Sequence, residues 1–269
     1  MLRAAHGQPT IGDWPLMTQA RVTMLGTGTS FGVPSVACDC PVCMSPDPRN
    51  QRDRASVYFE VDGVALLVDT ATEFRRQALR HRLRRVDAVL YTHAHADHVG
   101  GLDDLRRFCD AGPLACYGSI STQAAILKRF DYAFQPPAWA GSAPHLEFRP
   151  VFGSFRAAGV EVVPVPLRHG GMEVLAFRLG NVAYATDCNE IPPASRDLLR
   201  DLDLLILDAL RFTPHPTHFT LAESLEVIAD VRPRRALLTH VSHEIDHATV
   251  AASLPAGVEL AYDGLQVEV

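Results

Sequence analysis

Five short apolar runs in this chain of 269 residues each end at an aspartate or a histidine, and this pattern restricts the fold more than any other feature. Runs of this length and composition are typical of strands that are buried on both faces of a sheet. In open α/β folds, functional side chains gather at the carboxyl ends of such strands. The sequence therefore predicts an α/β fold in which five strands deliver polar side chains to one edge, at Asp69, His93, Asp187, Asp208 and His240.

Helical patterns and further strand patterns lie between these runs. Thr220–Glu223 has the spacing of a capping box, Ser119 is suited to cap a helix over 119–130, and Asp246 is suited to open a last short helix. We also expect an arginine-rich helix with a solvated face over 72–83, and strands at 22–25, 57–61, 160–165 and 174–179. A Thr-His pair closes the strands at both His93 and His240, which hints at an internal duplication.

Composition and charge exclude several classes of protein. The net charge of −6 provides no global basic field, so nucleic acid is not the expected partner. No apolar run approaches the roughly 18 residues that a membrane span needs. The start of the chain lacks the long apolar centre of a secretory signal, so we expect a cytoplasmic protein. Residues 1–20 are expected to form a loose, partly disordered leader before a single domain over 21–269.

Four metal-capable side chains lie within the six residues 93–98, His-Ala-His-Ala-Asp-His. Small alanines occupy the gaps, so that a turn here can point several side chains inward. Imidazoles together with a carboxylate suit zinc, manganese or iron better than calcium or magnesium. A run of six residues cannot close a coordination sphere by itself, so further ligands must come from distant parts of the chain.

This motif, with Asp69 before it and His169, Asp187 and His240 after it, resembles the metallo-β-lactamase superfamily. The resemblance implies a four-layer αββα sandwich with two divalent metal ions at one edge of its two sheets. It also implies the ligands. The first metal would be bound by His93, His95 and His169, the second by Asp97, His98 and His240, and both by a bridging Asp187. Asp69 would hydrogen-bond to the histidine loop and orient it. A hydroxide shared by metals about 3.5–4 Å apart would be the nucleophile.

A second group of metal-capable residues lies near the N-terminus. Cys38, Cys40 and Cys43 offer three thiolates within residues 38–43, and one further ligand would complete a tetrahedral structural zinc site. His243 is the preferred fourth ligand, because it follows the predicted active-site ligand His240 by three residues. His247 and an open three-thiolate arrangement remain as alternatives. Disulfides are not expected, because the chain lacks a secretory signal.

The glycine-rich stretch 26–34, the three cysteines and Thr239–His243 together resemble one branch of the superfamily. It is similar to the phosphodiesterases of the bacterial carbon–phosphorus lyase pathway for phosphonate use, which open 5-phosphoribosyl 1,2-cyclic phosphate and use manganese. The resemblance implies an enzyme that hydrolyses a small cyclic or linear phosphodiester, with Mn²⁺ or Zn²⁺ in the active site, one structural Zn²⁺ and a homodimeric assembly.

Three other functions remain open at this stage. The same broad branch includes tRNA 3′-end-processing endoribonucleases, and a related branch serves the biosynthesis of pyrroloquinoline quinone. The non-enzyme alternative is a zinc-stabilised binding module without turnover. For the enzyme, Asp97, Asp187 and His218 are the candidate catalytic residues.

His218 is the candidate proton donor for the leaving group, because the family branch has a histidine before the corresponding helix. Such a donor typically contributes about 10²–10⁴-fold to the rate. Glu223 is a candidate to orient His218, and Asp208 could support the site or cap a helix. Arg168 and Arg211 could contact phosphate oxygens, although a solvated arginine is the preferred interpretation for each.

Overall fold

The computed structural model describes residues 19–136, 139 and 141–269. Residues 1–18 of the predicted leader lie outside the described residues, and its last residue, Ala20, already begins the first strand. Within the described residues, none of the helices combines the length and hydrophobicity that a bilayer crossing needs.

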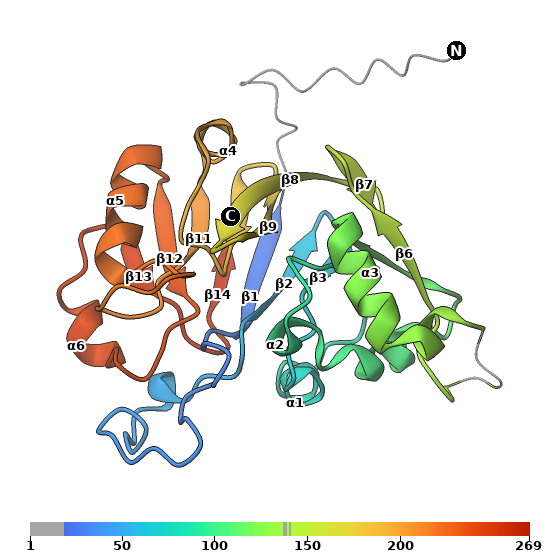
Figure 1. The fold of residues 1–269 in the computed structure, drawn as a ribbon, viewed down its shortest axis with the longest axis horizontal. Helices are drawn as coiled ribbons and strands as arrows, with labels where there is room; N and C mark the ends of the chain where they lie inside the picture. The colour runs from blue at the N-terminus through green and yellow to red at the C-terminus, as the bar shows by residue number, and fades with distance from the viewer. Residues whose placement is uncertain (1–18, 137–138, 140) are drawn as a thin grey trace.

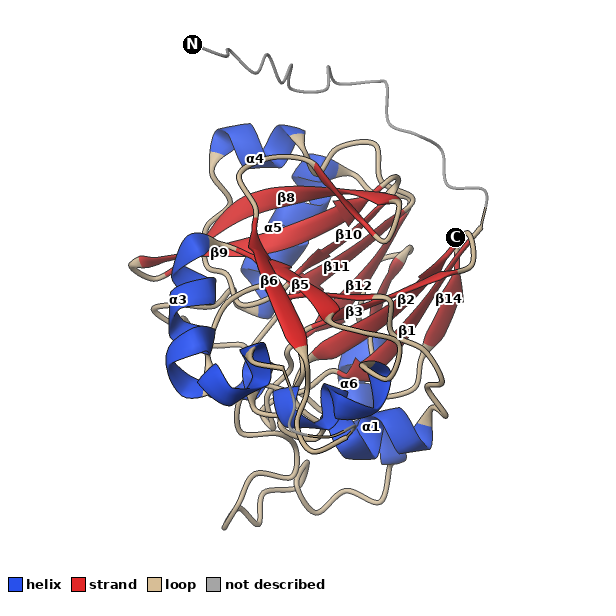
Figure 2. Ribbon diagram, turned by 90° about the vertical axis from the view of Figure 1, so that its right-hand side faces the viewer, coloured by secondary structure: helices blue, strands red, loops and turns tan. Residues whose placement is uncertain are grey.

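Two seven-stranded sheets pack face to face, and helices cover the outer face of each sheet (Figures 1 and 2). The first sheet has the strand order β14 (Gln266–Glu268), β1 (Ala20–Gly26), β2 (Ser56–Val61), β3 (Val64–Val68), β4 (Ala88–Leu90), β5 (Leu114–Gly118) and β6 (Leu146–Pro150). The second has the order β13 (Val258–Leu260), β12 (Arg235–Thr239), β11 (Leu204–Asp208), β10 (Val182–Ala185), β9 (Met172–Leu179), β8 (Val160–His169) and β7 (Phe155–Ala157). The predicted four-layer αββα sandwich is confirmed.

The helices divide between the two outer faces, apart from one 3₁₀ helix, η1 (Pro48–Asn50), in the N-terminal loop. The first sheet is covered by α1 (Phe74–Arg80), α2 (Ala96–Val99), η2 (Leu102–Phe108), α3 (Ile120–Arg129) and η3 (Asp131–Phe134). The second sheet is covered by α4 (Pro193–Asp197), α5 (Leu221–Val231) and α6 (His247–Ala251).

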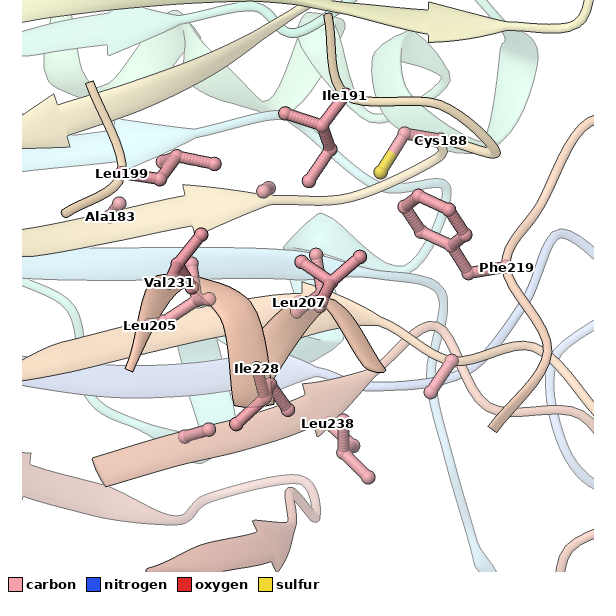
Figure 3. Packing of buried hydrophobic residues seen from close by; sticks show 14 of the residues in the cluster. Ala183, Cys188, Ile191, Leu199, Leu205, Leu207, Phe219, Ile228, Val231 and Leu238 are labelled. Atoms are coloured by element: carbon pink, nitrogen blue, oxygen red, sulfur yellow. The ribbon is translucent and has the colours of Figure 1, made fainter. Parts of the chain in front are cut away.

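Helix α5 shows why the sequence forms these elements where it does. Thr220 accepts from the backbone N–H of Glu223, and the Glu223 carboxylate accepts from the backbone N–H of Thr220, so the predicted capping box is confirmed. The apolar residues Val227, Ile228 and Val231 recur at helical spacing and pack on the outer face of the second sheet. Figure 3 shows Ile228 and Val231 in this layer.

The core consists of three apolar layers. One lies between the two sheets and takes Phe59 from β2 together with Phe177 from β9 and Tyr184 from β10. The other two lie between each sheet and its helices. Because β3, β4, β10 and β11 are sandwiched in this way, almost all of their residues are buried. This burial explains the uninterrupted apolar runs in the sequence.

The two sheets have matching topologies. Strands β1–β6 and β8–β13 repeat the same order, and each half contributes its last strand, β7 or β14, to the edge of the other sheet. In this repeat, β4 is equivalent to β11 and β5 is equivalent to β12. The Thr-His pairs follow β4 and β12, so they do not lie on equivalent strands. The repeat is therefore visible in the topology. The similar Thr-His pairs in the sequence do not result from it, because they follow non-equivalent strands.

Candidate metal centre

The polar strand ends meet at one edge of the sandwich, as the sequence predicts. Strands β3 and β4 are parallel neighbours in the first sheet, and β10, β11 and β12 are parallel neighbours in the second. At three of these ends the backbone turns through the left-handed region, with φ of 60° at Asp69, 53° at Asp187 and 58° at His240. Such conformations cost about 1–3 kcal/mol each in a residue with a side chain, and they concentrate at functional sites.

The first predicted ligand group is assembled in the structure. One ligand atom from each of His93, His95, His169 and Asp187 lies within 4.8 Å of every other. Hydrogen bonds fix the rings. His169 Nδ1 donates to the carbonyl of Thr217 at 2.8 Å, and His93 Nδ1 lies 3.0 Å from the Thr92 hydroxyl. These contacts leave Nε2 of both rings turned to the centre of the group, which is the arrangement that metal-ligating histidines use.

The second predicted ligand group, Asp97, His98, Asp187 and His240, is assembled beside the first and shares Asp187 with it. Asp69, which is fully buried, accepts from His98 Nδ1 at 2.7 Å and from the backbone N–H of Thr92 at 2.9 Å. Asp69 therefore orients His98 and connects it to the strand end that carries His93, as the sequence predicts.

The chemistry of this group fits a divalent cation. The Nε2 atoms of His98 and His240 lie 3.2 and 3.3 Å from the same Asp187 oxygen. Both nitrogens are buried, and neither makes a hydrogen bond within the described part of the chain. A buried polar atom without a partner costs about 1–3 kcal/mol. A shared metal ion would provide the partner that both nitrogens lack.

Electrostatics also favour a cation here. Burial alone would raise the pKa of Asp187, but the nearby His240 and His98 imidazoles hold it well below its usual range. Conversely, burial would lower the pKa of His240, but Asp187 and Asp97 raise it to about 9. The cluster of buried carboxylates thus attracts positive charge to its centre, and bound metal ions would supply that charge.

His218 lies beside this site and is positioned by Asp208. Its Nδ1 donates to Asp208 Oδ2 at 2.9 Å, and its ring is 4.7 Å from the rings of both His169 and His240. The structure corrects the partner suggested by the sequence. The Glu223 carboxylate is occupied by the capping box of α5 and does not contact His218. Asp208 is fully buried and supports the site; it does not cap a helix.

The cysteine cluster is also assembled, and it includes His243. The distances from His243 Nδ1 to the sulfurs of Cys38, Cys40 and Cys43 are 3.1, 3.5 and 3.5 Å. Tetrahedral Zn–S and Zn–N bonds would separate sulfur and nitrogen by about 3.6 Å. The alternative ligand His247 is directed elsewhere, with Nδ1 3.2 Å from the Arg52 guanidinium. A hydrogen bond from the Cys43 backbone N–H lowers the pKa of the Cys40 thiol to about 6.

The two arginines considered as phosphate contacts have other partners. Arg211 donates to the carbonyls of Thr213 and Pro214, and Arg168 lies on the surface 4.0 Å from Glu173. The sequence did not reveal the backbone and hydroxyl partners of the histidines, such as Thr217 and Thr92. No sequence signal identifies a carbonyl as a hydrogen-bond acceptor, but a hydroxyl next to a ligand, as in Thr92-His93, could have been considered.

Comparisons with known proteins agree with this geometry. Residues 65–241 match the family model described as the beta-lactamase superfamily domain. A crystal structure named as a new diphosphatase from the PhnP family is 40% identical, with a TM-score of 0.88, and the match covers 94% of this chain and 98% of that one. A coenzyme PQQ synthesis protein B from Methylobacterium nodulans is 35% identical over 69% of this chain and 71% of its own length.

A further curated relative is longer than this chain. An octanoyltransferase from Porphyromonas gingivalis is 36% identical over 91% of this chain, but the match spans 51% of the relative. This chain thus corresponds to about half of that protein. Fold, family model and paired donor groups together define a metal-dependent hydrolase domain of the metallo-β-lactamase superfamily, to which the chain belongs. Within that superfamily it is PhnP-like in sequence and structure.

Proposed function

We propose that the chain is a phosphodiesterase that hydrolyses a small cyclic or linear phosphodiester. The observation that carries the proposal is the pair of donor groups that share Asp187, with His218 held beside them. Similarity to a PhnP-family diphosphatase supports phosphorus–oxygen bond hydrolysis. The substrate resembles 5-phosphoribosyl 1,2-cyclic phosphate in its chemistry, a five-membered cyclic ester of a sugar.

The ligand assignment belongs to the same proposal. His93, His95 and His169 would hold one divalent ion, Asp97, His98 and His240 the other, and Asp187 both. Imidazole and carboxylate donors accommodate either Mn²⁺ or Zn²⁺. When bound, such a pair of metal ions would lower the pKa of a coordinated water to near neutral pH and would neutralise charge on the phosphoryl oxygens. Cys38, Cys40, Cys43 and His243 would hold a separate structural Zn²⁺.

The chain's own residues provide orientation and a proton. Asp69 and the Thr217 carbonyl fix the rings of His98 and His169, so that the ligand nitrogens are in place before substrate arrives. His218 donates its Nδ1 proton to Asp208, which leaves Nε2 free of any hydrogen bond to a described residue. In the doubly protonated ring, whose positive charge the Asp208 carboxylate stabilises, Nε2 carries the second proton and can pass it to the departing alkoxide.

A panel of phosphorus substrates tests the proposal. Metal-free protein reconstituted with Mn²⁺ or Zn²⁺ would be assayed with bis(p-nitrophenyl) phosphate, adenosine 2′,3′-cyclic phosphate, a linear dinucleotide and a tRNA precursor with a 3′ trailer. We expect metal-dependent turnover of the small diesters, and its loss in Asp187→Ala. Turnover of the tRNA precursor alone would favour the endoribonuclease, and no turnover with full metal content would favour the binding module.

A second candidate reaction is hydrolysis of a diphosphate, because the 40%-identical relative is named a diphosphatase. Both reactions use attack of water on phosphorus and departure of an oxygen leaving group, so the same site could serve either. A dinucleoside diphosphate added to the panel separates them. A cytoplasmic location and a homodimer complete the proposal. The six free cysteines support a reducing compartment, and light scattering of the purified protein would measure the assembly.

A further inference from the structure

A second imidazole, that of His215, lies beside the candidate proton donor. The ring centroids of His215 and His218 are 5.1 Å apart, and the rings are tilted by 49°. Neither Nε2 atom makes a hydrogen bond to a described residue, and neither belongs to the fully buried polar atoms of the described chain. Both nitrogens are therefore available to a molecule bound beside these rings.

The loop that carries His215 is held rigid. His215 lies between Pro214 and Pro216, and a proline fixes its own φ and restricts the residue before it. The Arg211 guanidinium closes the loop by donating to the carbonyl of Thr213 at 3.0 Å and to that of Pro214 at 2.7 Å. A ligand-binding loop benefits from this restraint because less entropy is lost on binding.

The hydrogen bonds of His215 define which nitrogen can donate. The backbone N–H of Thr217 donates to His215 Nδ1 at 3.3 Å, so Nδ1 acts as an acceptor and the proton of the neutral ring lies on Nε2. Burial lowers the pKa of His215, and the neighbouring His218 and Arg211 lower it further. At neutral pH the side chain is thus a neutral imidazole that presents an N–H donor to bound ligand.

We propose that His215 binds the leaving group of the substrate by donating a hydrogen bond from Nε2–H. The site would therefore prefer sugar-like leaving groups that carry a second oxygen close to the departing one. The inference rests on the proposed phosphodiesterase function and deepens it. His218 would protonate the departing oxygen, while His215 contacts the neighbouring hydroxyl or phosphate oxygen. Two neighbouring imidazoles suit a leaving group with oxygens on adjacent carbons better than a flat aryl group, which offers no second acceptor nearby.

Steady-state kinetics of three proteins test this role. His215→Phe keeps a ring without a donor, and His215→Gln keeps a donor without the ring. For adenosine 2′,3′-cyclic phosphate we expect KM to rise about 5- to 10-fold in His215→Phe with kcat nearly unchanged, as the loss of one neutral hydrogen bond requires. His215→Gln should recover part of the loss. For bis(p-nitrophenyl) phosphate all three proteins should agree within about twofold. Equal effects on both substrates, or none, would overturn the proposal.

A binding measurement separates this proposal from the proposed function. Calorimetry of adenosine 3′-monophosphate with the metal-loaded proteins should give about 5- to 10-fold weaker binding to His215→Phe than to wild type, and partial recovery in His215→Gln. If the three proteins bind the nucleotide in this pattern but wild type hydrolyses no diester, the proposed phosphodiesterase function is wrong and the proposed His215 contact is retained. Equal affinities in the three proteins, or no binding to any of them, overturn the contact whatever the activity.

Discussion

Asp208 accepts a hydrogen bond from His218 Nδ1 at 2.9 Å and a second from the backbone N–H of Cys188 at 3.0 Å through the same oxygen. Cys188 follows Asp187, the residue shared by the two donor groups. Phe219 N–H completes the connection by donating to the Cys188 carbonyl at 2.7 Å, and both residues are labelled in Figure 3. One buried carboxylate therefore fixes the candidate proton donor relative to the backbone of the candidate bridging ligand.

The first prediction concerns this carboxylate. In Asp208→Asn, the oxygen that accepts from both His218 and the Cys188 N–H belongs to a neutral amide, which is a weaker acceptor than a carboxylate, so the His218 ring is held less firmly and its protonated form loses a neighbouring negative charge. We expect kcat to fall about 10–100-fold, the range typical of groups that orient a metal site. The loss should be larger for alkyl leaving groups than for p-nitrophenolate. Metal content is measured in parallel, and exposed Asp110→Asn is the control. Equal losses for both leaving groups would contradict a role through His218.

The second prediction concerns Asp69, which has φ of 60° and accepts from His98 Nδ1 and from Thr92. Asparagine tolerates this backbone conformation better than alanine does. Both Asp69→Asn and Asp69→Ala should lower metal affinity about 10–100-fold. Asp69→Ala should also unfold at the lower temperature. Competition with a fluorescent chelator measures affinity, and calorimetric melting of metal-free protein measures stability. Unchanged affinity in both variants would remove the orienting role.

Much of the fold follows from local patterns. The predicted cap Ser119 accepts from the backbone of Thr122, Asp246 accepts from Thr249, and the strands expected near 22–25 and 174–179 are present in longer form. The edge strands β6, β7, β13 and β14 were not predicted. They are three to five residues long and partly exposed, so their identity depends on the neighbour with which they pair rather than on a pattern of their own.

The site was predictable to the extent that its chemistry lies in the side chains themselves. The motif at 93–98 and the isolated His169, Asp187 and His240 have the residue types of ligands, and the structure brings them together. The turn expected within the motif contains the short helix α2, which alternating alanines do not reveal. The partner of His218 was assigned to Glu223 because it is near in sequence, whereas Asp208 reaches His218 through the tertiary fold.

The third prediction tests the cysteine cluster. Cys40→Ser should remove one equivalent of bound zinc and leave the active-site metals in place, because the cysteine cluster shares no residue with either donor group of the active site. We expect a fall in melting temperature, since binding of a structural zinc contributes directly to folding. Metal analysis with melting curves measures both effects. Cys109→Ser is the matched control, because that half-buried thiol lies outside the cysteine cluster and donates to the carbonyl of Leu105. An unchanged melting temperature with full zinc content would contradict a structural zinc site.

The fourth prediction concerns pH. Burial, followed by the charges of Arg52 and Arg49, lowers the pKa of His247 to about 4. An unfolded histidine titrates near pH 6.5. The unfolded chain therefore binds this proton more readily, so the stability from His247 is complete above about pH 6.5 and is lost as pH falls toward 4. The shift corresponds to at most about 3 kcal/mol.

His247→Gln removes this titration while keeping an acceptor for Arg52, whose guanidinium is 3.2 Å from His247 Nδ1. Urea unfolding at pH 4.5, 5.5 and 6.5, with a chelator present throughout, should show a steeper pH dependence in wild type than in the variant. The difference between the two proteins isolates His247 from the other histidines. Parallel curves would show that His247 titrates normally in the folded protein.

The fifth prediction concerns the close contact between α1 and the metal-binding turn. Gly101 N–H donates to the Thr70 carbonyl at 3.0 Å, and Thr70 N–H donates to the His98 carbonyl at 2.8 Å, so the two segments lie side by side. A Cβ at Gly101 would overlap the carbonyl oxygen of Ala71 and lie 2.6 Å from Phe74 Cβ. Backbone cannot move aside there without shifting His98. Gly101→Ala should therefore lose about 1–3 kcal/mol of stability and also bind metal more weakly.

Gly153→Ala, whose Cβ would meet nothing within 4 Å, is the control and should match wild type in melting and metal titration. Reduced stability with unchanged metal affinity would mean that the strain stays in α1 and never reaches the ligands.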